Sequence, residues 1–235
     1  MSTAEREPRT SLPWLVDGER LDRATFHERY SAMPENTRAE LVGGVVYMAS
    51  PLGLGHGRSG VPVIVWLSYF AEHTPGTEVL DNASVFFDDY GEHQPDVVLR
   101  ILPDHGGRTS DMDKYFSNGP ELVVEVSDST LKKDLGPKLA DYERAGVPEY
   151  VVFSMKPPAV RWHQRVDGRL VEVGTDPDGL HRSKVFPGLW LDPAALLAGS
   201  TRRLREVVDL GLATEDHAEF VARLAAAGPG GAGRA

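Results

Sequence analysis

The chain has 235 residues, 41% of them hydrophobic, which is enough to form the core of one domain with extensions or of two small domains. It has no cysteine, which excludes disulfides, thiolate metal ligands and a cysteine nucleophile. The net charge of −10 argues against a protein that coats nucleic acid through a basic surface, although an enzyme can still bind nucleic acid in one local groove. No apolar run approaches the roughly 20 residues of a membrane span, and the charged N-terminus lacks the apolar core of a signal peptide. We therefore expect a cytoplasmic protein without membrane association.

The first third of the sequence predicts a flexible segment, a helix and a hairpin. Residues 1–19 are charged and are expected to be flexible. A short amphipathic helix is predicted over residues 22–31. Strands are predicted over 38–42 and 45–49, because two glycines between apolar runs are typical of a two-residue hairpin.

A longer helix and three strands are predicted next. The helix covers residues 56–72, where apolar residues recur at helical spacing, and Pro62 either kinks it or marks its start. A polar loop over 103–119 separates the second strand from the third. The strands are predicted over residues 79–88, 94–102 and 121–127.

The C-terminal half predicts a helix over residues 134–145, closed by Gly146, and then more strands. An apolar helical tail, 200–226, should pack on the domain or on a second subunit. Helices and strands mix without regular βαβ alternation, so we expect an α/β fold of mixed α+β type. The expected divisions are a domain over 20–198, a helical extension over 199–227 and a disordered tail over 228–235. The later strands are predicted over 149–155, 160–165 and 169–173.

Two carboxylates interrupt the apolar strands. Side chains alternate across a strand, so Asp96 and Glu125 each lie on the face opposite the cleanest apolar row of their strand. If the two strands are antiparallel neighbours, the carboxylates lie about 5 Å apart and repel, unless a cation lies between them or one takes a proton. Such oxygen ligands suit Mg²⁺ or Mn²⁺. The alternative is two ordinary strand-end residues that face solvent, and the metal site is the better interpretation.

Lys138, Glu40 and His56 are further candidates. Lys138 borders the apolar stripe of the helix over 134–145, from which it can reach the preceding strand end and stabilise a phosphate. The equal alternative is a solvated lysine whose stem covers apolar surface. Glu40 lies in the first hairpin strand. His56 follows a glycine-rich stretch without a phosphate-loop pattern, and a lone histidine is more often structural. Lys132 and Lys133 are interpreted as solvated loop residues.

Several sequence blocks resemble the Uma-type restriction endonuclease family (domain of unknown function 820) of the PD-(D/E)XK nuclease superfamily. The resemblance covers roughly residues 20–195, and the last block is the most specific. The blocks are Ala39-Glu40-Leu41-Val42-Gly43-Gly44, Ser50-Pro51 followed by His56, Gln94-Pro95-Asp96, Leu122-Val123-Val124-Glu125-Val126 with Ser129-Thr130, Lys138-Leu139, and Tyr142-Glu143-Arg144-Ala145-Gly146-Val147-Pro148-Glu149-Tyr150.

The resemblance implies a restriction-endonuclease-like mixed sheet flanked by helices, with an N-terminal hairpin and a C-terminal helical tail. It implies that Asp96, Glu125 and the backbone carbonyl of Val126 bind Mg²⁺ or Mn²⁺. Glu40 would be an additional acidic residue near the metal, and Lys138 the catalytic lysine. The superfamily usually has this lysine two residues after the second carboxylate, where this chain has Ser127.

We therefore predict a metal-dependent nuclease that acts on nucleic acid, DNA in particular, as a homodimer, with Asp96, Glu125, Lys138 and Glu40 in catalysis. His56 is expected to contact the substrate. One alternative is a non-catalytic dimerisation or nucleic-acid-binding protein on the same fold. Another is a carboxylate-based hydrolase of small phosphorylated substrates.

Overall fold

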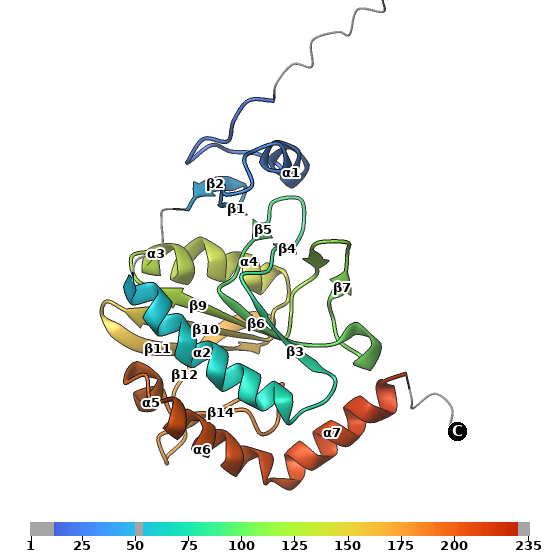
Figure 1. Ribbon diagram of the computed structural model, residues 1–235, viewed down its shortest axis with the longest axis vertical. Coiled ribbons are helices and arrows are strands. Elements are labelled where there is room, and N and C mark those ends of the chain that lie inside the picture. The colour runs from blue at the N-terminus through green and yellow to red at the C-terminus, as the bar shows by residue number, and fades with distance from the viewer. Residues whose placement is uncertain (1–11, 50–53, 230–235) are drawn as a thin grey trace, which may run out of the picture.

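The computed structural model describes residues 12–49 and 54–229, which form two mixed sheets with helices packed against them (Figure 1). The central sheet has the strand order β12-β11-β10-β9-β6-β3. Only β9 and β10 run parallel in it. Its strands are β3 (Thr77–Asp81), β6 (Val97–Ile101), β9 (Leu122–Ser127), β10 (Glu149–Met155), β11 (Pro158–Val166) and β12 (Arg169–Val173).

Helices cover both faces of the central sheet, which explains why its inner strands β6, β9 and β10 are mostly apolar and buried. Val97 and Leu99 of β6 pack toward one helical layer, and Val98 packs toward the other. The first layer contains α2 (Leu54–Glu72), α5 (Pro193–Leu197), α6 (Thr201–Leu212) and α7 (Glu215–Ala227). The second contains α3 (Leu131–Lys133), the π-helical turn η2 (Asp134–Lys138) and α4 (Leu139–Arg144).

The N-terminal sheet is built from short strands in the order β2-β1-β5-β4-β8-β7. Its hairpin and α1 (Arg23–Ser31) lie at one end of the molecule's long axis, and α5 to α7 lie at the other end (Figure 1). The strands are β1 (Ala39–Val42), β2 (Val45–Met48), β4 (Val85–Phe86), β5 (Glu92–His93), β7 (Ser110–Asp111) and β8 (Phe116–Ser117). The remaining elements are η1 (Pro103–His105), β13 (His181–Arg182) and β14 (Trp190–Leu191).

Two glycines form the hairpin turn, and the segment before the hairpin contacts α1. Gly43 and Gly44 both have positive φ angles, 58° and 74°, which is the conformation that a tight β1–β2 turn requires. Residues 12–19, which the sequence predicted to be flexible, pack against α1. The Arg29 guanidinium binds the carbonyl of Pro13 at 2.8 Å and the carboxylate of Glu19 at 2.7 Å. The rest of that segment, 1–11, lies outside the described residues, as do 230–235 of the predicted disordered tail.

The predicted mixed α/β fold, with its hairpin and helical tail, is confirmed, but several elements differ from the prediction. The expected strand over 79–88 divides between the two sheets, because the chain turns at Asn82, whose φ is 51°. The loop over 103–119 contains η1, β7 and β8. The helix expected from residue 134 begins at Leu131. The helix expected from residue 56 begins at Leu54, and Pro62 lies inside it and does not mark its start.

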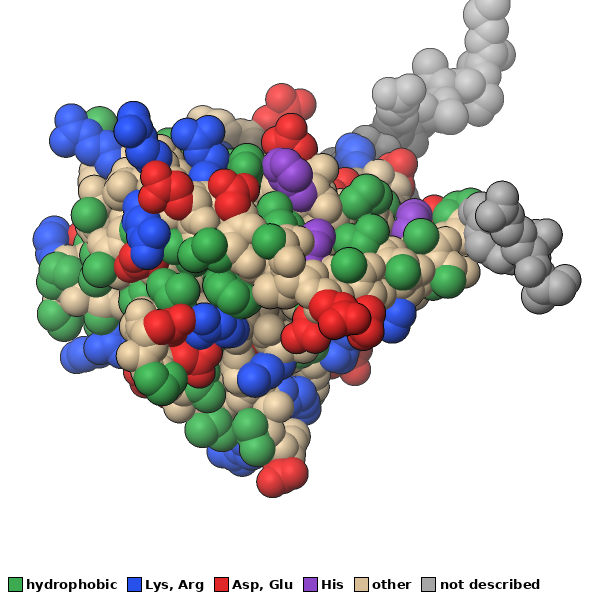
Figure 2. Space-filling view, turned by 90° about the horizontal axis from the view of Figure 1, so that it is seen from below, with side chains coloured by type: hydrophobic (Ala, Val, Ile, Leu, Met, Phe, Trp, Pro, Cys, Tyr) green, Lys and Arg blue, Asp and Glu red, His purple; other side chains and the backbone are tan. Residues whose placement is uncertain are grey.

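The predicted helical tail folds as two helices, because the chain turns between them and Thr214 caps α7. Leu204 and Val208 of α6 and Phe220 and Leu224 of α7 belong to the main core. The tail is therefore part of the domain's hydrophobic core. Figure 2 shows this side of the molecule, where acidic and basic side chains are interspersed with apolar ones. None of the helices in residues 12–49 and 54–229 is long and apolar enough to cross a membrane.

Asp141 of α4 joins the two sheets. Its buried carboxylate accepts hydrogen bonds from the Gly43 backbone N–H at 2.6 Å and from His93 Nε2 at 3.0 Å. Gly43 forms the β1–β2 turn and His93 lies in β5, so one side chain attaches the N-terminal sheet to the helix layer of the central sheet. Burial lowers the pKa of His93, which keeps its ring neutral and able to donate from Nε2.

Replacing Asp141 by alanine should destabilise the protein by about 2–4 kcal/mol, because two buried donors lose their acceptor. Asp113→Ala, at an exposed position, is the matched control and should change stability by less than about 0.5 kcal/mol. Urea unfolding measures both effects. The Gly43 amide should also exchange its hydrogen faster in Asp141→Ala. Equal stability of Asp141→Ala and Asp113→Ala would contradict the role of Asp141 in joining the two sheets.

Glu149 predicts a dependence of stability on pH. Its buried carboxyl lies 2.6 Å from Ser183 Oγ and 2.7 Å from the Lys184 backbone nitrogen, and burial raises its pKa from 4.5 to about 7. In the folded state this carboxyl keeps its proton up to about pH 7, whereas in the unfolded chain it loses the proton near pH 4.5. This contribution is fully present below pH 4.5 and is lost as the pH rises toward 7.

Glu149→Gln cannot ionise, so its stability relative to the wild type should rise by up to about 3 kcal/mol between pH 4.5 and 8. Urea unfolding at a series of pH values tests this difference. Glu172→Gln, at an exposed position on β12, should show the same dependence of stability on pH as the wild type. A constant difference between Glu149→Gln and the wild type across this range would refute the assignment.

Candidate functional site

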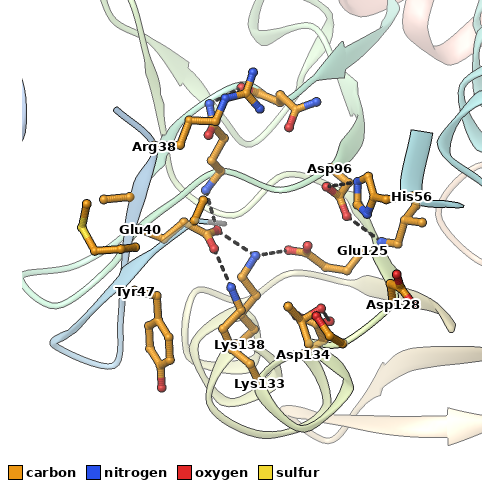
Figure 3. Close-up of a pocket in the computed structure, with 18 of the residues that line it drawn as sticks. Arg38, Glu40, Tyr47, His56, Asp96, Glu125, Asp128, Lys133, Asp134 and Lys138 are labelled. Carbon is orange, nitrogen blue, oxygen red and sulfur yellow. Dashed lines mark hydrogen bonds and ion pairs between the residues drawn. The ribbon is translucent and has the colours of Figure 1, made fainter. Parts of the chain in front are cut away.

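Two carboxylates meet at one end of the β6–β9 pair. Val97 pairs with Val124 across antiparallel strands, so Asp96, one residue earlier, lies opposite Glu125. The antiparallel pairing expected from the sequence is confirmed. It places both residues on the same face of the sheet, toward α3, η2 and α4. One Asp96 oxygen accepts a hydrogen bond from the Val126 backbone N–H at 2.6 Å, which fixes this carboxylate at the end of β9 (Figure 3).

Glu125 is bound by two side chains from the helix layer. Its Oε1 accepts from Lys138 Nζ at 2.7 Å and from the Tyr142 hydroxyl at 2.6 Å, and all three side chains are buried. Lys138 ends the π-helical turn, where Pro137 lacks the N–H that an α-helical hydrogen bond would need. A π turn adds one residue to the helix, and such turns are frequent at functional sites. Lys138 therefore points toward the strand end and away from solvent.

Glu40 brings the N-terminal hairpin to the same ammonium group. Its Oε1 lies 2.7 Å from Lys138 Nζ and 3.0 Å from the Gln94 backbone nitrogen, and its Oε2 lies 2.9 Å from Lys133 Nζ. Lys138 thus bridges Glu40 and Glu125, which belong to different sheets (Figure 3). The interpretation of Lys133 as a solvated loop residue was wrong. Lys133 lies in α3, and its side chain reaches back across the cavity to Glu40.

Burial and neighbouring charges shift the pKa values of the buried groups in this site. Burial raises the pKa of Glu125 to about 8. The ammonium of Lys138 lowers this pKa, and the nearby Asp96, Asp134 and Glu40 carboxylates offset part of that effect. Burial acts the same way on Glu40, but two lysines bind it and hold its pKa below the usual range. The carboxylates around Lys138 raise the pKa of its ammonium, although burial opposes its charge. The carboxylates around Lys138 thus favour its charged form, and Glu125 takes up a proton more readily than an ordinary carboxyl does.

His56 contacts Asp96 from the first turn of α2. Its Nε2 lies 3.3 Å from Asp96 Oδ1, and the hydrogen bond to Asp96 raises the pKa of His56, with a smaller contribution from the Val126 backbone. The structure thus places the predicted substrate-contacting histidine directly against a predicted metal ligand. The block Ser50-Pro51 and the first glycine of the glycine-rich stretch, Gly53, lie outside the described residues.

These residues line one cavity of about 520 Å³. Glu125 and Lys138 lie at its buried end, whereas Arg38 and Lys132 are exposed at its rim. Within residues 12–49 and 54–229, no three histidine, aspartate or glutamate side chains are arranged to hold a metal ion. Two carboxylates and a backbone carbonyl are hard oxygen donors. Mg²⁺ commonly binds one or two carboxylates and takes its other ligands from water and substrate phosphate, so the donors present fit such an ion.

Sequence reasoning missed two polar contacts at this site. Tyr142 was given no contact in the site, although it lies four residues after Lys138 and therefore on the same helical face. Asp134 is buried, and its carboxylate accepts from Thr130 Oγ1 at 2.6 Å. The spacing of Tyr142 from Lys138 could have revealed the first contact. The contact of Asp134 with Thr130 likewise joins residues four apart, which is the spacing of one helical turn.

Comparisons with known proteins agree with the geometry. The crystal structure of a putative nuclease belonging to DUF820 from Anabaena variabilis superposes with a TM-score of 0.53 at 12% sequence identity. The match covers 77% of this chain and 97% of that one, and at this identity it supports the fold alone. No match is found among the curated proteins.

A family model matches residues 24–194, which is well over half of the chain. Every site residue described above lies within this range. This range agrees with the resemblance found in the sequence. The chain therefore belongs to the Uma2 family, "Putative restriction endonuclease".

Proposed function

We propose that this protein is a metal-dependent nuclease that hydrolyses phosphodiester bonds of DNA. The observation that carries the proposal is the uncompensated charge around Glu125. This carboxyl is buried beside Asp96, Glu40 and Asp134, and burial together with these carboxylates raises its pKa despite the ammonium of Lys138, so further positive charge would favour its ionised form. A divalent cation between Asp96 and Glu125 would supply that charge. Buried like charges in a cavity are a common property of active sites.

Asp96, Glu125 and the Val126 carbonyl would hold Mg²⁺ or Mn²⁺. When bound, the ion supplies a Lewis acid for the phosphodiester and lowers the pKa of a coordinated water. Tyr142 and Lys138 both bind Oε1 of Glu125, which fixes the rotation of this carboxylate. The Val126 N–H fixes Asp96 in the same way. The ligands are thus held in place before any cation or substrate arrives.

Lys138 acts by charge. Its ammonium pairs with Glu40 and Glu125, which raise its pKa and favour the charged form. A buried ammonium beside the carboxylates can stabilise negative charge on a phosphate in the transition state. Glu40 holds Lys138 at 2.7 Å and is a positioning residue in this scheme. His56, beside Asp96, would contact the substrate phosphate from the opposite side of the cavity.

One observation favours the alternative of a non-catalytic protein on this fold. Lys138 already pairs with Glu40 and Glu125, so the cluster can serve as an internal ion pair that joins the two sheets. A buried ion pair of this kind can specify structure without chemistry. Metal binding separates the two functions, because only the nuclease requires it.

The wild type should bind Mn²⁺ in calorimetry and cleave at least one of single-stranded, duplex or branched DNA when Mn²⁺ is present. Asp96→Asn should weaken Mn²⁺ binding at least about tenfold and reduce cleavage by about 100-fold or more, because one ligand charge is lost. The exposed Asp113→Asn should match the wild type in both assays. A wild type that neither binds Mn²⁺ nor cleaves DNA would leave the non-catalytic alternative.

Lys138→Met should reduce turnover by about 100-fold or more, since one transition-state contact is removed. The side chain is buried between two carboxylates, so the variant should also lose up to about 3–5 kcal/mol of stability. Turnover is therefore measured at a temperature where circular dichroism shows a folded variant. Lys114→Met, at an exposed lysine, should preserve both properties. Full activity of folded Lys138→Met would remove Lys138 from the mechanism.

A further inference from the structure

The aromatic ring of Tyr47 forms part of the cavity wall beside the charged cluster. Tyr47 in β2 pairs directly with Glu40 in β1, and residues opposite each other on antiparallel strands share a face of the hairpin. The ring therefore lies on the same side as the carboxylate that binds Lys138. Figure 3 shows Tyr47 and Asp96 toward opposite ends of the close-up, with Glu40 and Lys138 between them.

Positive charge accompanies this ring. Lys133 Nζ lies 5.3 Å from the centre of the Tyr47 ring, within the range of a cation–π contact. Arg38 and Lys132 line the same cavity and are exposed. An aromatic face with lysine and arginine beside it is the combination by which proteins bind single strands, since bases stack on the ring and the cations follow the backbone.

The depth of the charged cluster restricts the form of the nucleic acid. The side chains of Glu125 and Lys138 are only 5% and 3% exposed, so a scissile phosphodiester must enter the cavity to approach them. A paired base is stacked on both sides within a duplex and cannot present a face to Tyr47. An unpaired nucleotide can place its phosphodiester in the cavity and also present the face of its base to Tyr47. The net charge of −10 also disfavours the extended phosphate contacts by which proteins hold a duplex.

We propose that the cavity binds an unpaired DNA strand, with one base stacked on Tyr47 and the adjacent phosphodiester directed toward Asp96 and Glu125. The position of the cleaved bond rests on the nuclease function proposed above, whereas the stacking of the base does not. Tyr47 is then the residue that selects single-stranded or locally unpaired DNA over duplex.

Fluorescence anisotropy in the presence of EDTA tests binding without cleavage, using labelled oligothymidine and a duplex of the same length at one fixed salt concentration. The wild type should bind the single strand more tightly than the duplex. Tyr47→Leu and Tyr47→Thr should bind oligothymidine about 5- to 100-fold more weakly. Tyr47→Phe and Tyr47→Trp should remain within about twofold of the wild type, because stacking needs only the ring. Tyr90→Leu, at an exposed tyrosine outside this cavity, is the matched control.

The outcomes for this inference and for the nuclease function can be separated. Tyr47-dependent binding of oligothymidine without any cleavage in Mn²⁺ would support the stacking site and contradict the nuclease. Equal binding of duplex and single strand by the wild type would overturn the inference. Wild-type affinity in folded Tyr47→Leu and Tyr47→Thr would overturn it too, even if DNA is cleaved.

Discussion

The buried ammonium group of Lys138 lies between two carboxylates that belong to different sheets, and the arrangement of the molecule depends on this contact. Glu125 comes from the central sheet and Glu40 from the N-terminal hairpin, and each lies 2.7 Å from Lys138 Nζ. A buried lysine is tolerated only when it is paired, and each carboxylate likewise needs the cation. The two sheets cannot separate without exposing or leaving unpaired three ionisable groups.

The helix layer supplies this contact because its geometry departs from a regular α-helix. The π turn that contains Gly136 and Pro137 directs Lys138 toward the strand end, while Tyr142 one turn later reaches the same oxygen of Glu125. Asp141, on the same helix, binds the hairpin turn at Gly43. A short helical stretch thus fixes both the hairpin that carries Glu40 and the lysine that Glu40 binds.

Sequence patterns predicted the central sheet and the carboxylate pair because both follow from strand periodicity. Alternation placed Asp96 and Glu125 opposite the apolar rows, and antiparallel pairing then required them to meet. The N-terminal sheet was mostly missed, because strands of two residues, such as β5 at Glu92–His93, are too short to show a period. Lys133 was misjudged for a related reason. Its partner Glu40 is 93 residues away, and no local pattern reports a contact between two sheets.

The distribution of charge explains how a chain with a net charge of −10 could still bind nucleic acid in one cavity. Most of its negative charge is spread over the surface, where salt screens it, whereas the charge that matters for chemistry is confined to one cavity. There, Lys133, Lys138 and the rim residue Arg38 offset the carboxylates on the side of the hairpin, and Asp96 and Glu125 remain on the side of the strand ends. In the proposed function, a phosphodiester in the cavity would meet cations along the hairpin wall, and Asp96 and Glu125 would hold the divalent ion at the strand ends.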